Sequence, residues 1–134
     1  MCAIANLGTM DSDTEAFEAC QIVCLEHQNH CLYAEIIQVL PSRGRFWLRP
    51  LMLGIWPLDA DLSFTQPPDE LYDLRQGADL VWPTTGFRLA WDTEVIPLLM
   101  QLETLEKSPD HPILALRQLR YFVDRVWQAS SEPV

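Results

Sequence analysis

One stretch constrains the fold of this chain more than any other. Two apolar runs, residues 32–40 and 45–56, lie on either side of Pro41-Ser42-Arg43-Gly44. Both runs are rich in β-branched and aromatic residues, and the four residues between them are turn formers. The pattern predicts a β-hairpin in which Leu40 pairs with Arg45 across the turn.

Side chains alternate between the two faces of a hairpin, so each face can be assigned. One face is apolar apart from Glu35 and is expected to be core; it carries Tyr33, Glu35, Ile37, Val39, Phe46, Leu48, Pro50 and Met52. The opposite face mixes guanidinium, indole, amide and aliphatic groups, and Trp beside Arg is the composition of binding hot spots. We expect this outer face to contact a partner through Ile36, Gln38, Arg45, Trp47 and Arg49. Pro50 cannot donate a ladder hydrogen bond, so part of the sheet is expected to lack a partner strand.

The segments before and after the hairpin predict further elements. Ser12-Asp13-Thr14-Glu15 has the pattern of a capping box, and apolar residues at helical spacing after it predict a helix that ends near His27. Residues 69–76 fit either a short helix or a strand. Two short apolar stretches at 78–82 and 87–91 predict a second hairpin, because turn formers join them.

Two helices are predicted in the last third of the chain. The first follows Asp92 or Thr93, and the second begins after Asp110 with Pro112 in its first turn. The expected fold is α+β, a small antiparallel sheet of about four strands packed against an N-terminal helix and a C-terminal helical pair. We expect residues 1–134 to form one domain, with residues 1–11 and 130–134 loose.

Charge and hydropathy exclude several classes of partner. The net charge of −10 argues against nucleic acid, since phosphate binding needs a basic surface. No apolar run approaches the ~18 residues of a membrane span, and the first ten residues lack the basic start of a signal peptide. We therefore expect a soluble, cytoplasmic protein without a nucleic-acid or membrane partner. Residues 43–58 carry three arginines and no acid; these arginines either meet a partner or pair with the protein's own surplus acids.

A group of cysteines and histidines raises the question of a metal site. Cys20, Cys24, His27, His30 and Cys31 offer the ligands that zinc prefers. One helix, however, can direct only two residues an i,i+4 step apart at a metal, so we expect none. We take Cys20 and Cys24 to be small buried hydrophobic residues rather than parts of a disulfide framework.

Catalytic motifs are equally sparse. The five glycines are scattered, which excludes a phosphate-binding loop, and no Ser or Cys stands in a nucleophile motif. Glu35 on the expected core face is either a catalytic acid or a structural carboxylate paired with an Arg. We favour the second, because no other carboxylate or His is placed beside it. We expect no enzyme activity and no cofactor; the alternative is a small enzyme or metal-binding protein that uses Glu35 or the Cys20, Cys24 and His27 group.

The hairpin carries a resemblance together with the segments Leu71–Gly77, Leu80–Pro83 and Asp92–Leu99. Here the chain resembles a family of small cyanobacterial accessory proteins with no assigned enzyme activity, and the CcmS family of carboxysome assembly chaperones, which engage a shell-protein tail. No diagnostic motif is involved, so no functional residue is carried over. The resemblance implies a non-enzymatic adaptor or assembly chaperone that recognises a short or extended segment of a partner protein. A homodimer is left open.

Overall fold

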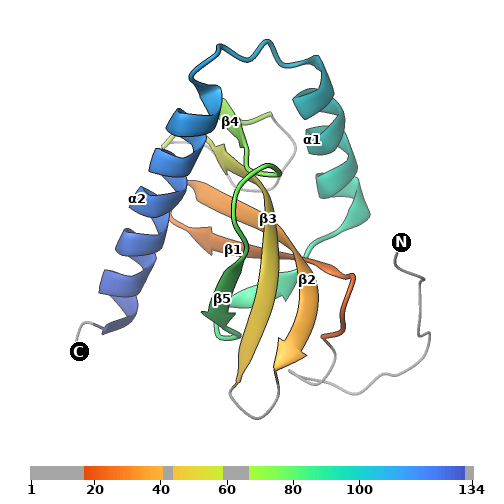
Figure 1. Ribbon diagram of the computed structural model, residues 1–134, viewed down its shortest axis with the longest axis vertical. Helices are drawn as coiled ribbons and strands as arrows, with labels where there is room; N and C mark the ends of the chain where they lie inside the picture. Colours follow the sequence, from red (N-terminus) through yellow and green to blue (C-terminus); the bar gives the residue numbers. More distant parts are fainter. Residues whose placement is uncertain (1–16, 41–43, 59–66, 132–134) are drawn as a thin grey trace.

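The computed structural model describes residues 17–40, 44–58 and 67–131 (Figure 1). These residues form one antiparallel sheet followed by two helices. The sheet order is β4-β3-β2-β1-β6, and β5 also pairs with β3. The elements are β1 (Ile22–His27), β2 (His30–Leu40), β3 (Arg45–Ile55), β4 (Glu70–Asp73), β5 (Leu80–Pro83), β6 (Phe87–Leu89), α1 (Asp92–Thr104) and α2 (His111–Ser131).

The hairpin predicted at the centre of the chain is present as β2 and β3, with Leu40 opposite Arg45. Gly44 in the turn has a φ of +61°, a conformation that glycine adopts without strain. The pairing is irregular at two places, between Tyr33 and Ala34 and between Ile36 and Gln38. Each irregularity changes which side chains share a face.

These irregularities correct two of the predicted positions. Ile36 lies opposite Leu48 and is fully buried, so its prediction as a contact residue was wrong. Glu35 lies opposite Arg49 and is only half-buried, so its prediction as a core residue was also wrong. An extra residue in a strand reverses the alternation after it, and nothing in the sequence marks where it is inserted.

The sheet has six strands rather than about four, and the predicted N-terminal helix is wrong, because residues 22–27 form β1. Val23 and Leu25 enter the core on one face of the sheet, and Cys24 enters it on the other. A strand that is buried on both faces has a continuous apolar run, which periodicity cannot distinguish from a buried helix. The predicted capping box and residues 1–11 lie outside the described residues.

The second predicted hairpin is wrong in its pairing. β5 pairs with β3, whereas β6 pairs with β1. Only residues 84–86 join β5 to β6, a connection that spans at most about 14 Å. The sheet is therefore rolled until these two strands approach each other. Phe46 of β3 and Phe87 of β6 meet inside the roll, with ring centroids 5.6 Å apart.

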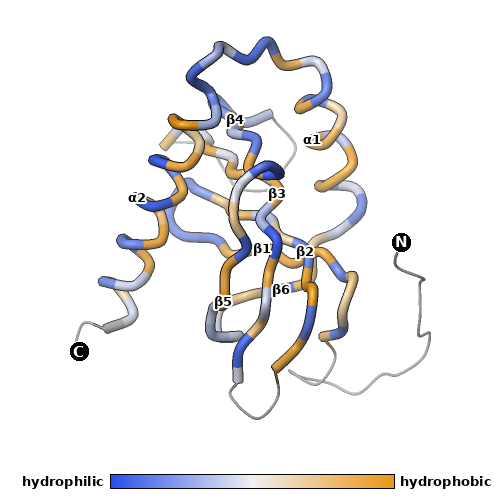
Figure 2. Tube along the Cα trace, in the orientation of Figure 1, coloured by the Kyte–Doolittle hydropathy of each residue, from blue (hydrophilic) through white to orange (hydrophobic). Residues whose placement is uncertain are grey.

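The two helices lie on opposite faces of the sheet (Figure 1). On the inner face, Leu119 and Phe122 of α2 pack against side chains such as Leu32. On the outer face, Leu98 of α1 packs in a cluster with Tyr33. Apolar positions recur along α2 at helical spacing in Figure 2, as an amphipathic helix requires. The helix continues to Ser131, past residue 130 where we expected the chain to be loose.

Candidate functional site

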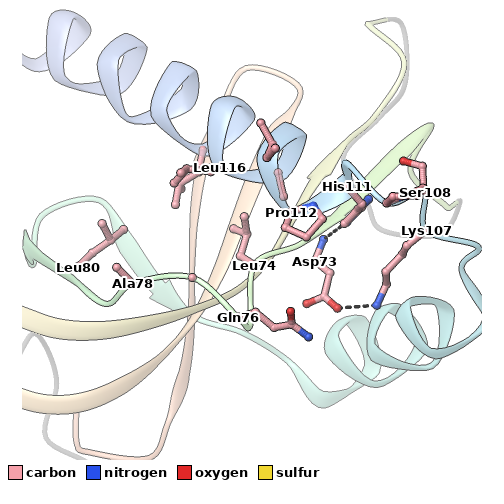
Figure 3. A pocket seen from close by; sticks show the side chains of 15 residues that line it. Asp73, Leu74, Gln76, Ala78, Leu80, Lys107, Ser108, His111, Pro112 and Leu116 are labelled. Atoms are coloured by element: carbon pink, nitrogen blue, oxygen red, sulfur yellow. Dashed lines mark hydrogen bonds and ion pairs between the residues drawn. The ribbon is translucent and has the colours of Figure 1, made fainter.

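A groove of about 620 Å³ lies between the first half of α2 and residues 73–80, which link β4 to β5 (Figure 3). Leu74 and Leu119 are buried beneath it, while Leu116 and Ile113 are exposed beside it. Ligand sites in proteins are usually concave and mostly apolar, with volumes of about 300–1,000 Å³. We call this feature the α2–β5 groove.

The groove exists because small residues line the space between α2 and the segment that joins β4 to β5. β4 ends at Asp73 and β5 begins at Leu80, so the chain between them crosses the free side of β3. The backbone N–H of Leu74 donates to the carbonyl of Leu51 at 3.0 Å, which fixes the floor. Gly77, Ala78 and Ala115 line the groove without filling it.

Polar side chains gather at one end of the groove. The Asp73 carboxylate accepts a hydrogen bond from Lys107 Nζ at 2.7 Å (Figure 3) and another from Arg75 Nε at 2.9 Å. Burial raises the pKa of Asp73, but the bonds from Arg75 and Lys107 outweigh it and hold that pKa well below its usual range. Arg75 also pairs with Glu103 at 3.1 Å. This end of the groove is therefore electrically balanced.

His111 completes the polar end. Its Nε2 accepts the backbone N–H of Asp73 at 3.1 Å, a role that only a neutral imidazole can play. Its ring also stacks on Tyr72, with centroids 5.9 Å apart. His111 is thus engaged in joining α2 to β4.

Aromatic rings stand beyond the other end of the groove. Leu80 and Trp82 share one face of β5, since side chains alternate along a strand. Trp82 contacts Trp127 of α2 at a centroid distance of 5.3 Å. Within the described residues β5 pairs only with β3, so its second edge is open. Pro83 suits such an edge strand, because proline lacks the N–H of a ladder hydrogen bond.

The predicted contact residues lie on the opposite face of the sheet from the groove. Gln38, Arg45 and Arg49 are exposed, and Trp47 is 39% exposed. Ile36 is the exception, because it is buried on the inner face. The structure therefore brings four of the five predicted residues together on one accessible surface.

Asp79 connects this surface to the groove. It accepts hydrogen bonds from Trp47 Nε1 at 2.9 Å and from Arg49 Nε at 3.2 Å. The alternative prediction, that hairpin arginines pair with the protein's own acids, is thus confirmed for Arg49. Asp79 immediately precedes Leu80, which lines the groove, so these bonds fix that wall of the groove from the outer face of the sheet.

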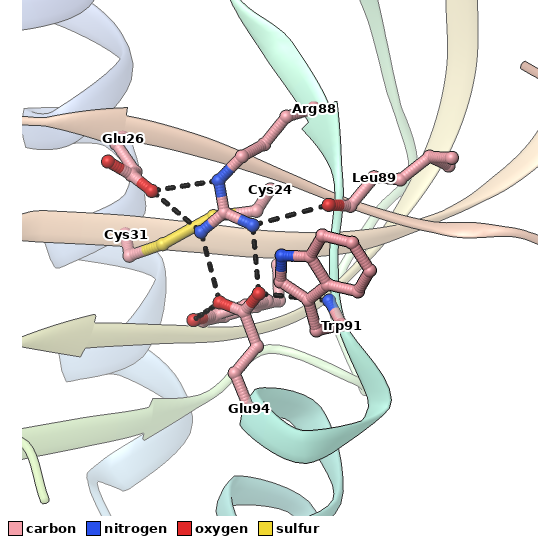
Figure 4. Close-up of a disulfide and its surroundings, with 8 residues drawn as sticks. Cys24, Glu26, Cys31, Arg88, Leu89, Trp91 and Glu94 are labelled. Carbon is pink, nitrogen blue, oxygen red and sulfur yellow. Dashed lines mark hydrogen bonds and ion pairs between the residues drawn. A yellow bond between two sulfur atoms is a disulfide. The ribbon is translucent and has the colours of Figure 1, made fainter. Parts of the chain in front are cut away.

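Four of the five cysteines and histidines considered for metal binding lie on two faces of the β1–β2 hairpin. Cys24 and Cys31 are fully buried and form a disulfide (Figure 4), so the prediction that Cys24 is unpaired was wrong. His27 and His30 lie on the other face, where their ring centroids are 6.4 and 6.0 Å from that of Phe122. The disulfide was missed because it follows from the strand pairing, and residues 22–27 had been predicted to be helical.

The remaining candidates for chemistry do not converge on one site. Cys20 lies before β1 and is disulfide-bonded as well, and its backbone N–H donates to the carbonyl of Ile36 at 2.7 Å. Glu35 lies on the outer face of the sheet beside Arg49, whereas His27 lies on the inner face. The predicted group of Cys20, Cys24 and His27 is not brought together, because Cys24 is disulfide-bonded on the face opposite to that of His27.

One cluster among the described residues has the spacing of metal ligands. The ligand atoms of Cys24, Glu26 and Cys31 lie within 4.8 Å of one another. The two sulfur atoms are bonded to each other, and Glu26 Oε2 accepts a hydrogen bond from Arg88 at 2.6 Å. These groups are therefore already engaged within the protein.

A partly buried charge cluster that the sequence analysis missed joins α1 to the sheet (Figure 4). Arg88 donates to both Glu26 and Glu94, with distances from 2.6 to 3.0 Å. Glu94 is 5% exposed and also accepts from Tyr33 Oη at 2.8 Å and from the Trp91 backbone N–H at 2.9 Å. Burial raises the pKa of Glu94, but these hydrogen bonds lower it by more. The sequence did offer one signal for Glu94: it stands three residues after Trp91, the position from which a Glu caps the start of a helix.

Comparison with known proteins gives no assignment: no family model, no curated protein and no solved structure matches this chain. The resemblance to cyanobacterial accessory proteins therefore stays a prediction. Among the described residues, neither helix combines the length and apolar character needed to cross a membrane.

Proposed function

We propose that this protein is a non-enzymatic adaptor or assembly chaperone that holds a short segment of a partner protein in the α2–β5 groove. The groove itself is the observation that carries the proposal: an apolar trough beside an open strand edge. Leu116 is 48% exposed and Ile113 is 62% exposed at its rim. Covering such apolar side chains favours association.

The polar groups of the groove support binding rather than catalysis. Asp73, Arg75 and Lys107 are engaged with one another, and His111 accepts a backbone hydrogen bond. Ser108, which also lines the groove, donates to Asp110 at 2.6 Å, whereas His111 is bonded to the Asp73 backbone and does not serve Ser108 as a base. The open edge of β5 suits an extended segment, which can add its own backbone hydrogen bonds to those of a sheet.

The resemblance suggests a first partner and location. A shell-protein tail is the segment that such a chaperone would hold, and carboxysome assembly in the cytoplasm is the corresponding process. Both belong to this proposal and are tested with synthetic tail peptides in the assay below.

The experiment is a selection from a displayed library of random dodecapeptides, followed by fluorescence anisotropy with the enriched peptides. Leu116→Glu places a charge in the groove and should weaken binding by about tenfold or more, since about 1.4 kcal/mol of lost apolar contact suffices. The matched control is Met100→Glu on α1, because Met100 is equally apolar and 65% exposed. Thermal melting of both variants checks that they are folded.

Two results would count against the proposal. One is a selection in which the protein enriches no peptide relative to the same selection done without protein. The other is an enriched peptide that binds the Leu116→Glu variant as tightly as it binds the Met100→Glu variant and the wild type.

A further inference from the structure

Arg120 stands on the groove side of α2. It follows Leu116 by four residues and precedes Trp127 by seven, and both spacings place side chains on the same helical face. Arg120 is exposed, and it makes no hydrogen bond or ion pair with the other described residues. The apolar face that borders the groove therefore contains one uncommitted positive charge.

Two other arginines near the groove are already engaged, and Arg117, one position after Leu116, is exposed further round the helix. Arg75 pairs with Asp73 and Glu103 at the polar end. Arg125, on the other side of α2, donates to Gln28 at 3.1 Å and lies over the ring of Tyr121. Arg120 is distinguished from these by its place between the polar end of the groove and the Trp pair.

The charge of α2 differs in sign from that of the chain. The helix holds Arg117, Arg120 and Arg125 against Asp124, which is a surplus of two positive charges in a chain of net charge −10. Long-range repulsion by the acidic chain is screened beyond about 8 Å at physiological salt, whereas a direct contact is screened much less. A carboxylate that reaches the groove will therefore interact chiefly with this helix.

We infer that the segment held in the α2–β5 groove is apolar and carries one acidic residue, whose carboxylate pairs with Arg120. The inference rests on the proposed function and names the chemistry of its partner. A guanidinium presents a planar fork of donors that matches a carboxylate. Leu80, Leu116 and Leu119 would receive the neighbouring apolar side chains.

The dimensions of the groove set the length of the segment. Between Leu116 and Trp127 the helix rises about 16 Å, at about 1.5 Å per residue. An extended chain of about five residues covers that length, at about 3.3 Å per residue. Successive side chains of such a segment face opposite ways, so an acidic residue with apolar residues two positions before or after it fits the site.

The test compares dodecapeptide selections on the wild type, Arg120→Gln and Arg125→Gln. We expect Asp or Glu with an apolar residue two positions away to be enriched on the wild type and on Arg125→Gln, and not on Arg120→Gln. Arg125→Gln is the matched control, because it removes the same charge from another side of the same helix. A frequency of acidic residues equal to that of the input library on the wild type would overturn the inference.

Anisotropy then measures the pair directly. Replacing the acidic residue of a selected peptide by its amide should weaken binding to the wild type about tenfold and to Arg120→Gln less than about twofold, as expected of one charged hydrogen-bonded pair. This difference should shrink as salt is raised from 0.05 to about 0.5 M. Equal losses for both proteins would contradict the pairing.

The outcomes separate this inference from the proposed function. If Leu116→Glu abolishes peptide binding while Arg120→Gln changes nothing, the groove binds peptides without this charge pair. If neither variant changes binding, the proposed function fails as well. Dodecanoate is the probe for a different occupant: if it binds with an affinity that depends on Arg120 while no peptide binds, the site holds an acyl carboxylate and the inference is overturned.

Discussion

At the scale of single residues, Glu94 connects two layers of the fold. Its carboxylate receives hydrogen bonds from Arg88, Tyr33 and the backbone of Trp91, and it is almost fully buried. Glu94→Gln removes the charge that compensates Arg88, although Glu26 continues to pair with that arginine. We expect a loss of about 1.5–3 kcal/mol in the free energy of unfolding, measured by urea denaturation, because a neutral amide replaces the charged acceptor of the bonds from Arg88 and Tyr33.

The pH dependence of stability follows from the same carboxylate. Because the pKa of Glu94 is lower in the folded protein than its usual value, its contribution is present above the pKa of the unfolded chain. That contribution is lost as the pH falls through the lower, folded pKa. Stability should therefore decline below about pH 4 in the wild type and decline less steeply in Glu94→Gln. Glu103→Gln, at a 70% exposed side chain, is the control and should keep the slope of the wild type.

Trp47 discriminates between the two surfaces that this fold offers. Trp47→Ala removes the bond to Asp79 on an exposed face, so it should cost about 1 kcal/mol of stability. Arg49 still donates to Asp79 in this variant, so the groove wall keeps one of its two bonds. Binding in the groove then requires that the affinity for a selected peptide stay within about threefold of that of the wild type. A loss of about 2 kcal/mol or more in binding, without unfolding, would make the outer face of the hairpin the contact surface, as its sequence predicts.

At the scale of elements, the β1–β2 hairpin shows what the sequence could and could not reveal. The β2–β3 hairpin was predictable because its turn formers separate two β-rich runs, and α2 because its apolar stripe has the helical period. β1 was not predictable, because Val23, Cys24 and Leu25 are all buried and their hydrophobicity therefore shows no period of two. The Cys24–Cys31 disulfide and the position of Glu26 depend on that strand, so they could not be predicted either.

The disulfide should contribute measurably to this hairpin. It closes a loop across a sequence separation of seven residues, and constraining such a loop in the unfolded chain is worth about 2 kcal/mol. The double variant Cys24→Ala, Cys31→Ala should lose about that much stability in urea denaturation. Alkylation of the denatured, unreduced wild type, followed by mass spectrometry, checks the bond itself: labelling of both cysteines would contradict it.

At the scale of the whole molecule, the groove results from the roll of the sheet. β4 and β5 pair with opposite ends of β3, and the chain between them forms a wall facing α2. The sequence predicts the elements on both sides of this groove, residues 78–82 and the last helix. Their juxtaposition was not predictable, because it depends on β5 pairing with β3 rather than with β6.

The location of peptide binding is the central claim, and hydrogen–deuterium exchange of the full chain tests it most directly. Exchange is compared with and without a selected dodecapeptide at saturating concentration. We expect slower exchange in residues 74–82, where the wall and open edge of β5 lie, and in residues 112–127 of α2, with no change in α1. Slower exchange confined to residues 36–49, with none in β5 or α2, would contradict the account and place the contact on the outer face of the hairpin.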